Sequence, residues 1–128
     1  MSGSLRTPLG RVRGHGSAKA GTGHFIAQRV TAIALLLLAP YLVVAAALTM
    51  PQGYEGAYGF IAQPWIAAPL LLAILVALYH MRIGMQVVIE DYIERPGTKA
   101  ALLILNAFVA ASFALAAGYA IIKLSLGA

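Results

Sequence analysis

Residues 66–89 read IAAPLLLAILVALYHMRIGMQVVI, an apolar stretch of 24 residues whose only basic side chains are His80 and Arg82. A helix of about 20 residues crosses a hydrocarbon core of roughly 30 Å, so this stretch is long enough to span a membrane. Two more stretches qualify, because residues 30–50 and 100–122 provide 21 and 23 residues without a charge. We therefore predict an all-α membrane protein with three transmembrane helices at about these positions.

The composition excludes a soluble domain. Of 128 residues, 61% are hydrophobic and 10% are charged, and the mean hydropathy is +0.85. A soluble protein of this size could not cover so much apolar surface with polar groups. The chain has no cysteine, which excludes disulfides and thiolate metal sites within it. We expect a basic segment over residues 1–24 and a membrane-anchor domain over residues 25–128.

Basic residues are distributed unevenly about the three predicted spans. One side carries seven of them: Arg6, Arg11, Arg13, Lys19, Arg29, Arg95 and Lys99. The other side carries only Lys123. The positive-inside rule then predicts a cytoplasmic N-terminus and a periplasmic C-terminus in a bacterial inner membrane. Because residues 1–24 also resemble a transit peptide, the mitochondrial inner membrane is the alternative. The basic residues flank spans and lack interleaved aromatics, so no nucleic-acid partner is expected.

His80 lies deep in the second span. It precedes Glu90, at the end of the span, by ten residues, or about 15 Å along a helix. Lipid offers an imidazole no hydrogen-bond partner, so the ring must face protein or a cofactor. Gly84, Val87 and Asp91 fall within roughly 40° of His80 on a helical wheel. This face could ligate haem toward a neighbouring subunit, hydrogen-bond across a helix interface, or relay protons.

Three further residues have two interpretations each, and a fourth, Arg82, is expected to contact another chain. Tyr92 and Asp91 suit interfacial anchoring or a quinone site, where a phenol donates a hydrogen bond and a carboxylate relays protons. Arg29 suits an interfacial anchor or a clamp for a haem propionate. Arg82 points roughly 200° away from His80, and we expect it to meet a carboxylate, a propionate or a quinone of another chain.

The second span also carries the pattern His80-x3-Gly84-Met85-x5-Asp91-Tyr92, and residues 24–33 read HFIAQRVTAI. These two segments and the three spans resemble the small hydrophobic membrane anchor, of the cytochrome b type, of succinate dehydrogenase (respiratory complex II). That complex joins the tricarboxylic acid cycle to electron transport.

The resemblance implies a non-catalytic anchor for succinate oxidation that contributes to quinone reduction. Its partners would be a flavoprotein subunit, an iron–sulfur subunit and a second cytochrome b anchor subunit. His80 would be one axial ligand to the iron of a haem b shared with that second anchor, and Gly84 would give the haem room. Tyr92 and Asp91 would bind ubiquinone, and Arg29 would lie near the quinone and the haem propionates. Arg82 departs from the aromatic or neutral residue of relatives, so its role stays open.

Other functions fit the same residues. A fumarate reductase anchor would run the reaction in reverse with menaquinone. A haem-free scaffold or a small transporter component would use His80 only for packing. Since no second histidine lies within the predicted spans, another chain must supply the second haem ligand. That chain could be the partner anchor or a second copy carrying its own His80.

Overall fold

The computed structural model describes residues 7–14 and 21–127, and within these ranges it is built from helices without strands. Three long helices cover the three predicted spans except for Met50: α2 (Gly21–Thr49), α4 (Pro64–Tyr92) and α5 (Pro96–Leu126). Two shorter helices are α1 (Pro8–Gly14) and α3 (Tyr54–Ala62). The prediction of an all-α protein with three membrane-spanning helices is confirmed. The predicted basic residues Arg6 and Lys19 lie outside the described residues.

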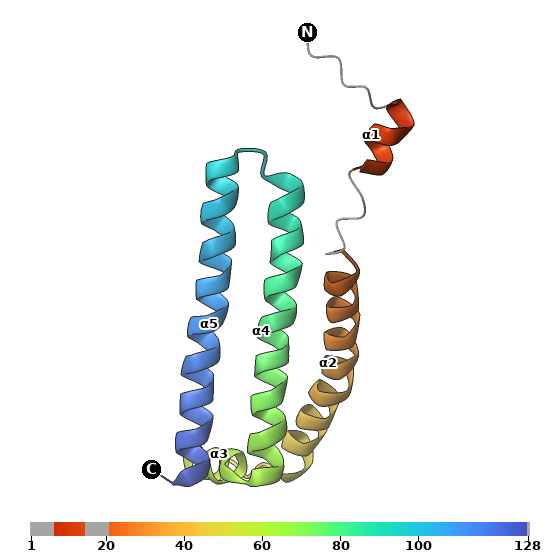
Figure 1. Cartoon of the computed structure of the whole chain (residues 1–128). Coiled ribbons are helices and arrows are strands. Elements are labelled where there is room, and N and C mark those ends of the chain that lie inside the picture. The colour runs from red at the N-terminus through yellow and green to blue at the C-terminus, as the bar shows by residue number, and fades with distance from the viewer. Residues whose placement is uncertain (1–6, 15–20, 128) are drawn as a thin grey trace.

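The long helices stand side by side, with α4 between α2 and α5 (Figure 1). Helix α2 begins, α4 ends and α5 begins at the same end of the bundle, which we call the Tyr92 end (Figure 1). Arg95 and Lys99 lie at this end, whereas Lys123 lies near the opposite end of α5. The fold thus separates the basic residues as the positive-inside argument requires, and the cytoplasmic location of the Tyr92 end remains a prediction.

The surfaces of the long helices are mostly apolar and unburied. The three helices have 29, 29 and 31 residues, which gives about 43–47 Å at 1.5 Å per residue and exceeds the hydrocarbon thickness. Only 6%, 22% and 6% of the most apolar segments of α2, α4 and α5 is buried within the chain. Helix α4 is the most covered because it packs on both neighbours. The remaining apolar surface is left for lipid or for other subunits.

Helix α3 occupies the connection between α2 and α4, a segment whose glycines and prolines are typical of turns. It crosses the bundle end opposite the Tyr92 end (Figure 1). It contacts α4 and α5, and its Phe60 is buried. Gly53 begins it with a φ of 86°, which favours glycine. A Cβ at Gly56 would come within 2.8 Å of Pro51, so a side chain there would have to displace backbone. The connection between α2 and α4 therefore contains a glycine turn followed by a short helix.

Candidate functional site

His80 is half-buried in the middle of α4 and faces α2 of the same chain. Its Nδ1 lies 2.8 Å from Oγ1 of Thr31. Its Nε2 lies 3.4 Å from Nε2 of Gln28, which is long for a hydrogen bond. The ring therefore faces protein, which is one of the two environments, protein or a cofactor, that the sequence predicted. The neighbouring protein is α2 of the same chain. The sequence had suggested a face directed toward another subunit, and the structure adds this contact within the chain.

The structure agrees with the helical wheel for Gly84 and Val87, two of the three residues predicted to share the His80 face. A Cβ at Gly84 would lie 3.6 Å from Nε2 of Gln28, so Gly84 also faces α2. Val87, one turn further along, lines a cleft with residues of α2. Asp91 lies beyond this cleft and is exposed. The shared face of α4 therefore runs from the imidazole toward the Tyr92 end.

A cleft of about 520 Å³ lies between α2 and α4 at the Tyr92 side of His80. It is lined by apolar and polar side chains of both helices: Gly21, His24, Phe25, Gln28, Arg29, Ile83, Val87 and Glu90. The guanidinium of Arg29 lies 5.0 Å from the centre of the Phe25 ring, a distance typical of a cation–π contact. The cleft extends from Gln28, which contacts His80, to Arg29. Its apolar walls and the guanidinium of Arg29 suit a ligand with an apolar body and an anionic edge.

Tyr92 and Asp91 do not line this cleft. Tyr92 is 80% exposed, and it lines a separate depression of about 310 Å³ with Ile93 and Thr98 among its neighbours. The end of α4 is held by Lys99, whose Nζ donates a hydrogen bond of 2.8 Å to the carbonyl oxygen of Glu90. A basic side chain satisfies a free carbonyl of a helix C-terminus in this way. Within this chain, the side chain of Tyr92 therefore points outward, and Tyr92 and Arg29 do not line the same cleft.

Arg82 lies on the other side of α4 from His80. It is exposed, and it lines a groove of about 170 Å³ between α4 and α5. The groove floor on α5 consists of four alanines, small residues that permit close helix packing: Ala107, Ala110, Ala111 and Ala114. The carbonyl oxygen of Arg82 accepts a hydrogen bond of 2.9 Å from Nδ2 of Asn106. The wheel therefore separated Arg82 correctly from the His80 face.

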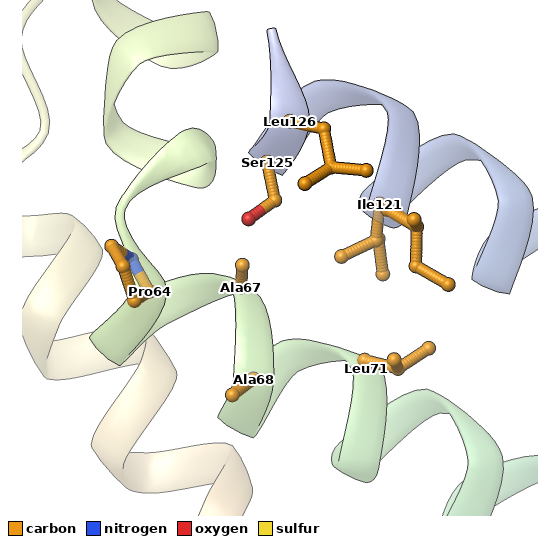
Figure 2. A pocket seen from close by; sticks show the side chains of 8 residues that line it. Pro64, Ala67, Ala68, Leu71, Ile121, Ser125 and Leu126 are labelled. Carbon is orange, nitrogen blue, oxygen red and sulfur yellow. The ribbon is translucent and has the colours of Figure 1, made fainter. Parts of the chain in front are cut away.

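Another cavity, of about 310 Å³, lies far from these residues, between the start of α4 and the end of α5 (Figure 2). Its wall is apolar apart from the side chain of Ser125 (Figure 2). Ala67, which lines it, precedes His80 by 13 residues, or about 20 Å of helix. It lacks ionisable side chains and is remote from the histidine, so it does not contribute to the candidate site.

Gln28 and Thr31 are site residues that the sequence analysis missed. Both lie in the segment HFIAQRVTAI that carried the resemblance, where only Arg29 was singled out. Thr31 lies three residues after Gln28, so both fall on one helix face, and this spacing could have drawn attention to them. Within the described ranges, no group of three or more His, Cys, Asp or Glu side chains could hold a metal ion. Haem ligation by His80 would need only one imidazole from this chain, and it stays a prediction.

Comparisons with known proteins agree on one family. Residues 3–116 match the family model described as succinate dehydrogenase/fumarate reductase transmembrane subunit. The chain is 36% identical over 94 residues to a Rickettsia bellii protein, covering 73% of this chain and 75% of the relative. It is 31% identical over 122 residues to a Paracoccus denitrificans protein, covering 95% and 94%. Both relatives are named succinate dehydrogenase hydrophobic membrane anchor subunit. No solved structure matches the chain significantly.

The match covers most of the chain and both segments on which the resemblance rested. The relatives are bacterial, and the chain has three helices long and apolar enough to cross a membrane. It is therefore a multi-pass protein of the bacterial inner membrane, as predicted. Membrane anchoring also implies that other subunits of a complex accompany it. The chain belongs to the succinate dehydrogenase/fumarate reductase transmembrane subunit family, as a hydrophobic membrane anchor subunit.

Proposed function

We propose that this chain anchors a succinate-oxidising complex in the membrane, holds one side of a haem b through His80, and contributes to ubiquinone reduction. The partners would be a second anchor subunit, an iron–sulfur subunit and a flavoprotein subunit. The observation that carries the haem assignment is the environment of the imidazole. Nδ1 has a close partner in Thr31, whereas Nε2 has only the 3.4 Å contact with Gln28. One ring nitrogen is therefore oriented by protein and the other is weakly engaged.

The residues around His80 fit a haem by their chemistry. Oε1 of Gln28 is buried and has no hydrogen-bond partner in the described part of the chain, so this amide is incompletely satisfied where it stands. Gln28 could leave Nε2 without breaking a strong bond. A haem bound here would supply a one-electron redox centre whose potential depends on its axial ligand. His80 would ligate the iron, and Arg29 would bind a propionate at the cleft mouth.

An alternative use of His80 is packing alone, since a histidine bonded across a helix interface is also what the structure contains. The two uses are compatible because packing employs Nδ1 and ligation would employ Nε2. The family assignment favours ligation over packing alone. The second ligand would come from another chain, which we place in the partner anchor subunit.

Ubiquinone reduction takes up two electrons and two protons to give ubiquinol. We infer that the Tyr92 hydroxyl donates a hydrogen bond to a quinone carbonyl, which stabilises negative charge as electrons arrive from the iron–sulfur subunit. Asp91, exposed beside it, would relay protons from water to the quinone oxygens. Because Tyr92 points outward, partner subunits must complete the site. Arg82 is exposed beside the groove between α4 and α5. We propose that its side chain contacts a group of another chain.

The same geometry would serve a fumarate reductase anchor, in which menaquinol gives up electrons and protons through the same groups. The two relatives described above are named for succinate dehydrogenase, which favours the forward direction. The direction of the reaction depends on the redox potentials of the quinone and of the partner subunits. It does not depend on the fold of this chain.

Co-purification tests the proposed assembly. The tagged full chain, extracted in mild detergent, should carry along a flavoprotein with flavin and an iron–sulfur protein, together with a second small membrane subunit. Succinate should then reduce added ubiquinone in the purified sample. Recovery of the chain alone, or with subunits that lack flavin and iron–sulfur clusters, would contradict the proposal.

Gly84→Ala tests the room for the haem. A Cβ at this position makes only an ordinary contact with Gln28, so the chain itself should fold and assemble. A methyl group one turn from His80 would crowd a bound macrocycle, and overpacking of about 1–3 kcal/mol lowers affinity by about 5- to 150-fold. We expect a lower ratio of haem to flavin in the purified complex. Gly118→Ala, a matched substitution on α5 near Leu71, should leave this ratio unchanged.

A further inference from the structure

We propose that Thr31 is a positioning residue for His80, which holds the imidazole as the tautomer protonated on Nδ1 and leaves Nε2 as the nitrogen available to iron. The assignment of iron rests on the proposed function, whereas the assignment of the tautomer does not. The side chain of Thr31 is 9% exposed. All other polar side chains in the described part of the chain are more exposed. A polar group buried in a membrane helix must be satisfied by specific partners.

The hydrogen bonds of the Thr31 hydroxyl determine the direction of the contact. Its Oγ1 lies 2.7 Å from the carbonyl oxygen of Ala27, 3.1 Å from that of Gln28 and 2.8 Å from Nδ1 of His80. A carbonyl oxygen can only accept, and the hydroxyl has a single proton to donate. If the proton went to the imidazole, two oxygen acceptors would face each other at 2.7 Å with no proton between them. The proton therefore goes to Ala27, and Oγ1 accepts from the Nδ1–H of His80.

Protonation of Nδ1 in a neutral imidazole leaves a lone pair on Nε2. The amide of Gln28 can donate to that lone pair only weakly, at 3.4 Å. A metal-bound histidine usually donates its second N–H to a protein acceptor, which fixes the ring orientation and raises the basicity of the ligating nitrogen. Thr31 supplies such an acceptor within this chain, so the imidazole is oriented before any other subunit is added.

The choice of threonine suits this role. Its branched β-carbon restricts χ1 in a helix, where its hydroxyl can bond the carbonyl of the preceding turn. The acceptor is thus held in place by the bond to Ala27. Serine would keep the hydroxyl without the methyl group, and valine would keep the shape without the oxygen. Thr49 offers a matched control, because its hydroxyl makes the same bond of 2.6 Å to Ala45 and it is exposed at the far end of α2.

The tautomer can be measured on the haem-free full chain in lipid vesicles. The chain has three histidines, and isotope-labelled histidine with nitrogen NMR reports which ring nitrogen carries the proton. The His80 signals are identified by their absence in His80→Asn. At about pH 8, where an ordinary imidazole is neutral, His80 should be protonated on Nδ1. Thr31→Val should shift the population toward Nε2–H, whereas Thr31→Ser and Thr49→Val should keep the wild-type tautomer. Protonation of wild-type His80 on Nε2, or no change in Thr31→Val, would overturn the inference.

The purified complex gives a second readout. Loss of the acceptor should weaken electron donation by His80 and raise the haem midpoint potential in Thr31→Val, with wild-type potentials in Thr31→Ser and Thr49→Val. A complex of Thr31→Val that keeps its haem at an unchanged potential contradicts the positioning role. If Thr31→Val loses haem, the NMR measurement alone decides. If the wild-type complex holds no haem, the proposed function fails while the tautomer measurement still tests the contact with Thr31.

Discussion

Replacing His80 by alanine should abolish the haem b absorption of the purified complex. In the proposed function the imidazole is the iron ligand that this chain supplies, and a methyl group cannot coordinate iron. Its removal also leaves the Thr31 hydroxyl bonded only to helix carbonyls, so the loss is confined to the middle of the α2–α4 contact. The measurement is the reduced-minus-oxidised optical spectrum, normalised to flavin content.

His24→Ala is the matched control for this experiment. His24 is also on the α2–α4 side of the chain but is exposed, and it lies at the cleft mouth near the start of α2. It precedes Thr31 by seven residues, or about 10 Å of helix, so it is too shallow to replace His80. His24 lines the cleft but is assigned no bond to the iron or to a propionate, so the haem spectrum should survive this substitution. An unchanged spectrum in His80→Ala would show that the iron is held elsewhere.

Replacing Tyr92 by phenylalanine should lower succinate–ubiquinone reductase activity by about 10- to 150-fold. The substitution keeps the ring and removes one hydrogen bond to a developing charge, which contributes about 1.5–3 kcal/mol. Reduction of an artificial dye by succinate should continue at the normal rate, because in the proposed assembly a dye takes electrons from the other subunits before they reach the quinone site. The ratio of the two rates separates a defect in quinone chemistry from a defect in assembly.

Tyr54→Phe provides the control for Tyr92→Phe. Tyr54 is as exposed as Tyr92, at 77% against 80%, but it begins α3 at the opposite end of the bundle. Both rates should remain normal in this variant. If Tyr92→Phe also leaves ubiquinone reduction intact, Tyr92 is an interfacial anchor and the quinone site lies elsewhere.

The sequence predicted the helices well because membrane spans have a strong signal. Uncharged stretches longer than the hydrocarbon core leave few alternatives to a helix, since every backbone group must be satisfied internally. The helix ends were predicted less well, because helices continue into the interface where composition is ordinary. Helix α2 starts at Gly21, nine residues before the predicted span, and α3 arose in a connection rich in glycine.

The candidate site was predicted in part. The wheel placed Gly84 and Val87 on the His80 face and Arg82 away from it, because positions within one helix follow from its 3.6-residue period. The partners of His80 on α2 could not be obtained in this way, since they depend on how two helices pack. Thr31 resembled any threonine in an apolar span until the structure placed its hydroxyl 2.8 Å from the imidazole.

The central claim is that Nε2 of His80 binds the iron of a haem while Nδ1 remains on Thr31. A density map of the purified complex, at a resolution that shows side chains, tests it most directly. We predict a macrocycle bonded to Nε2 of His80, a second axial ligand from a neighbouring subunit, and the Thr31 hydroxyl still beside Nδ1. A map in which this imidazole meets only lipid or ordinary side chains would contradict the account.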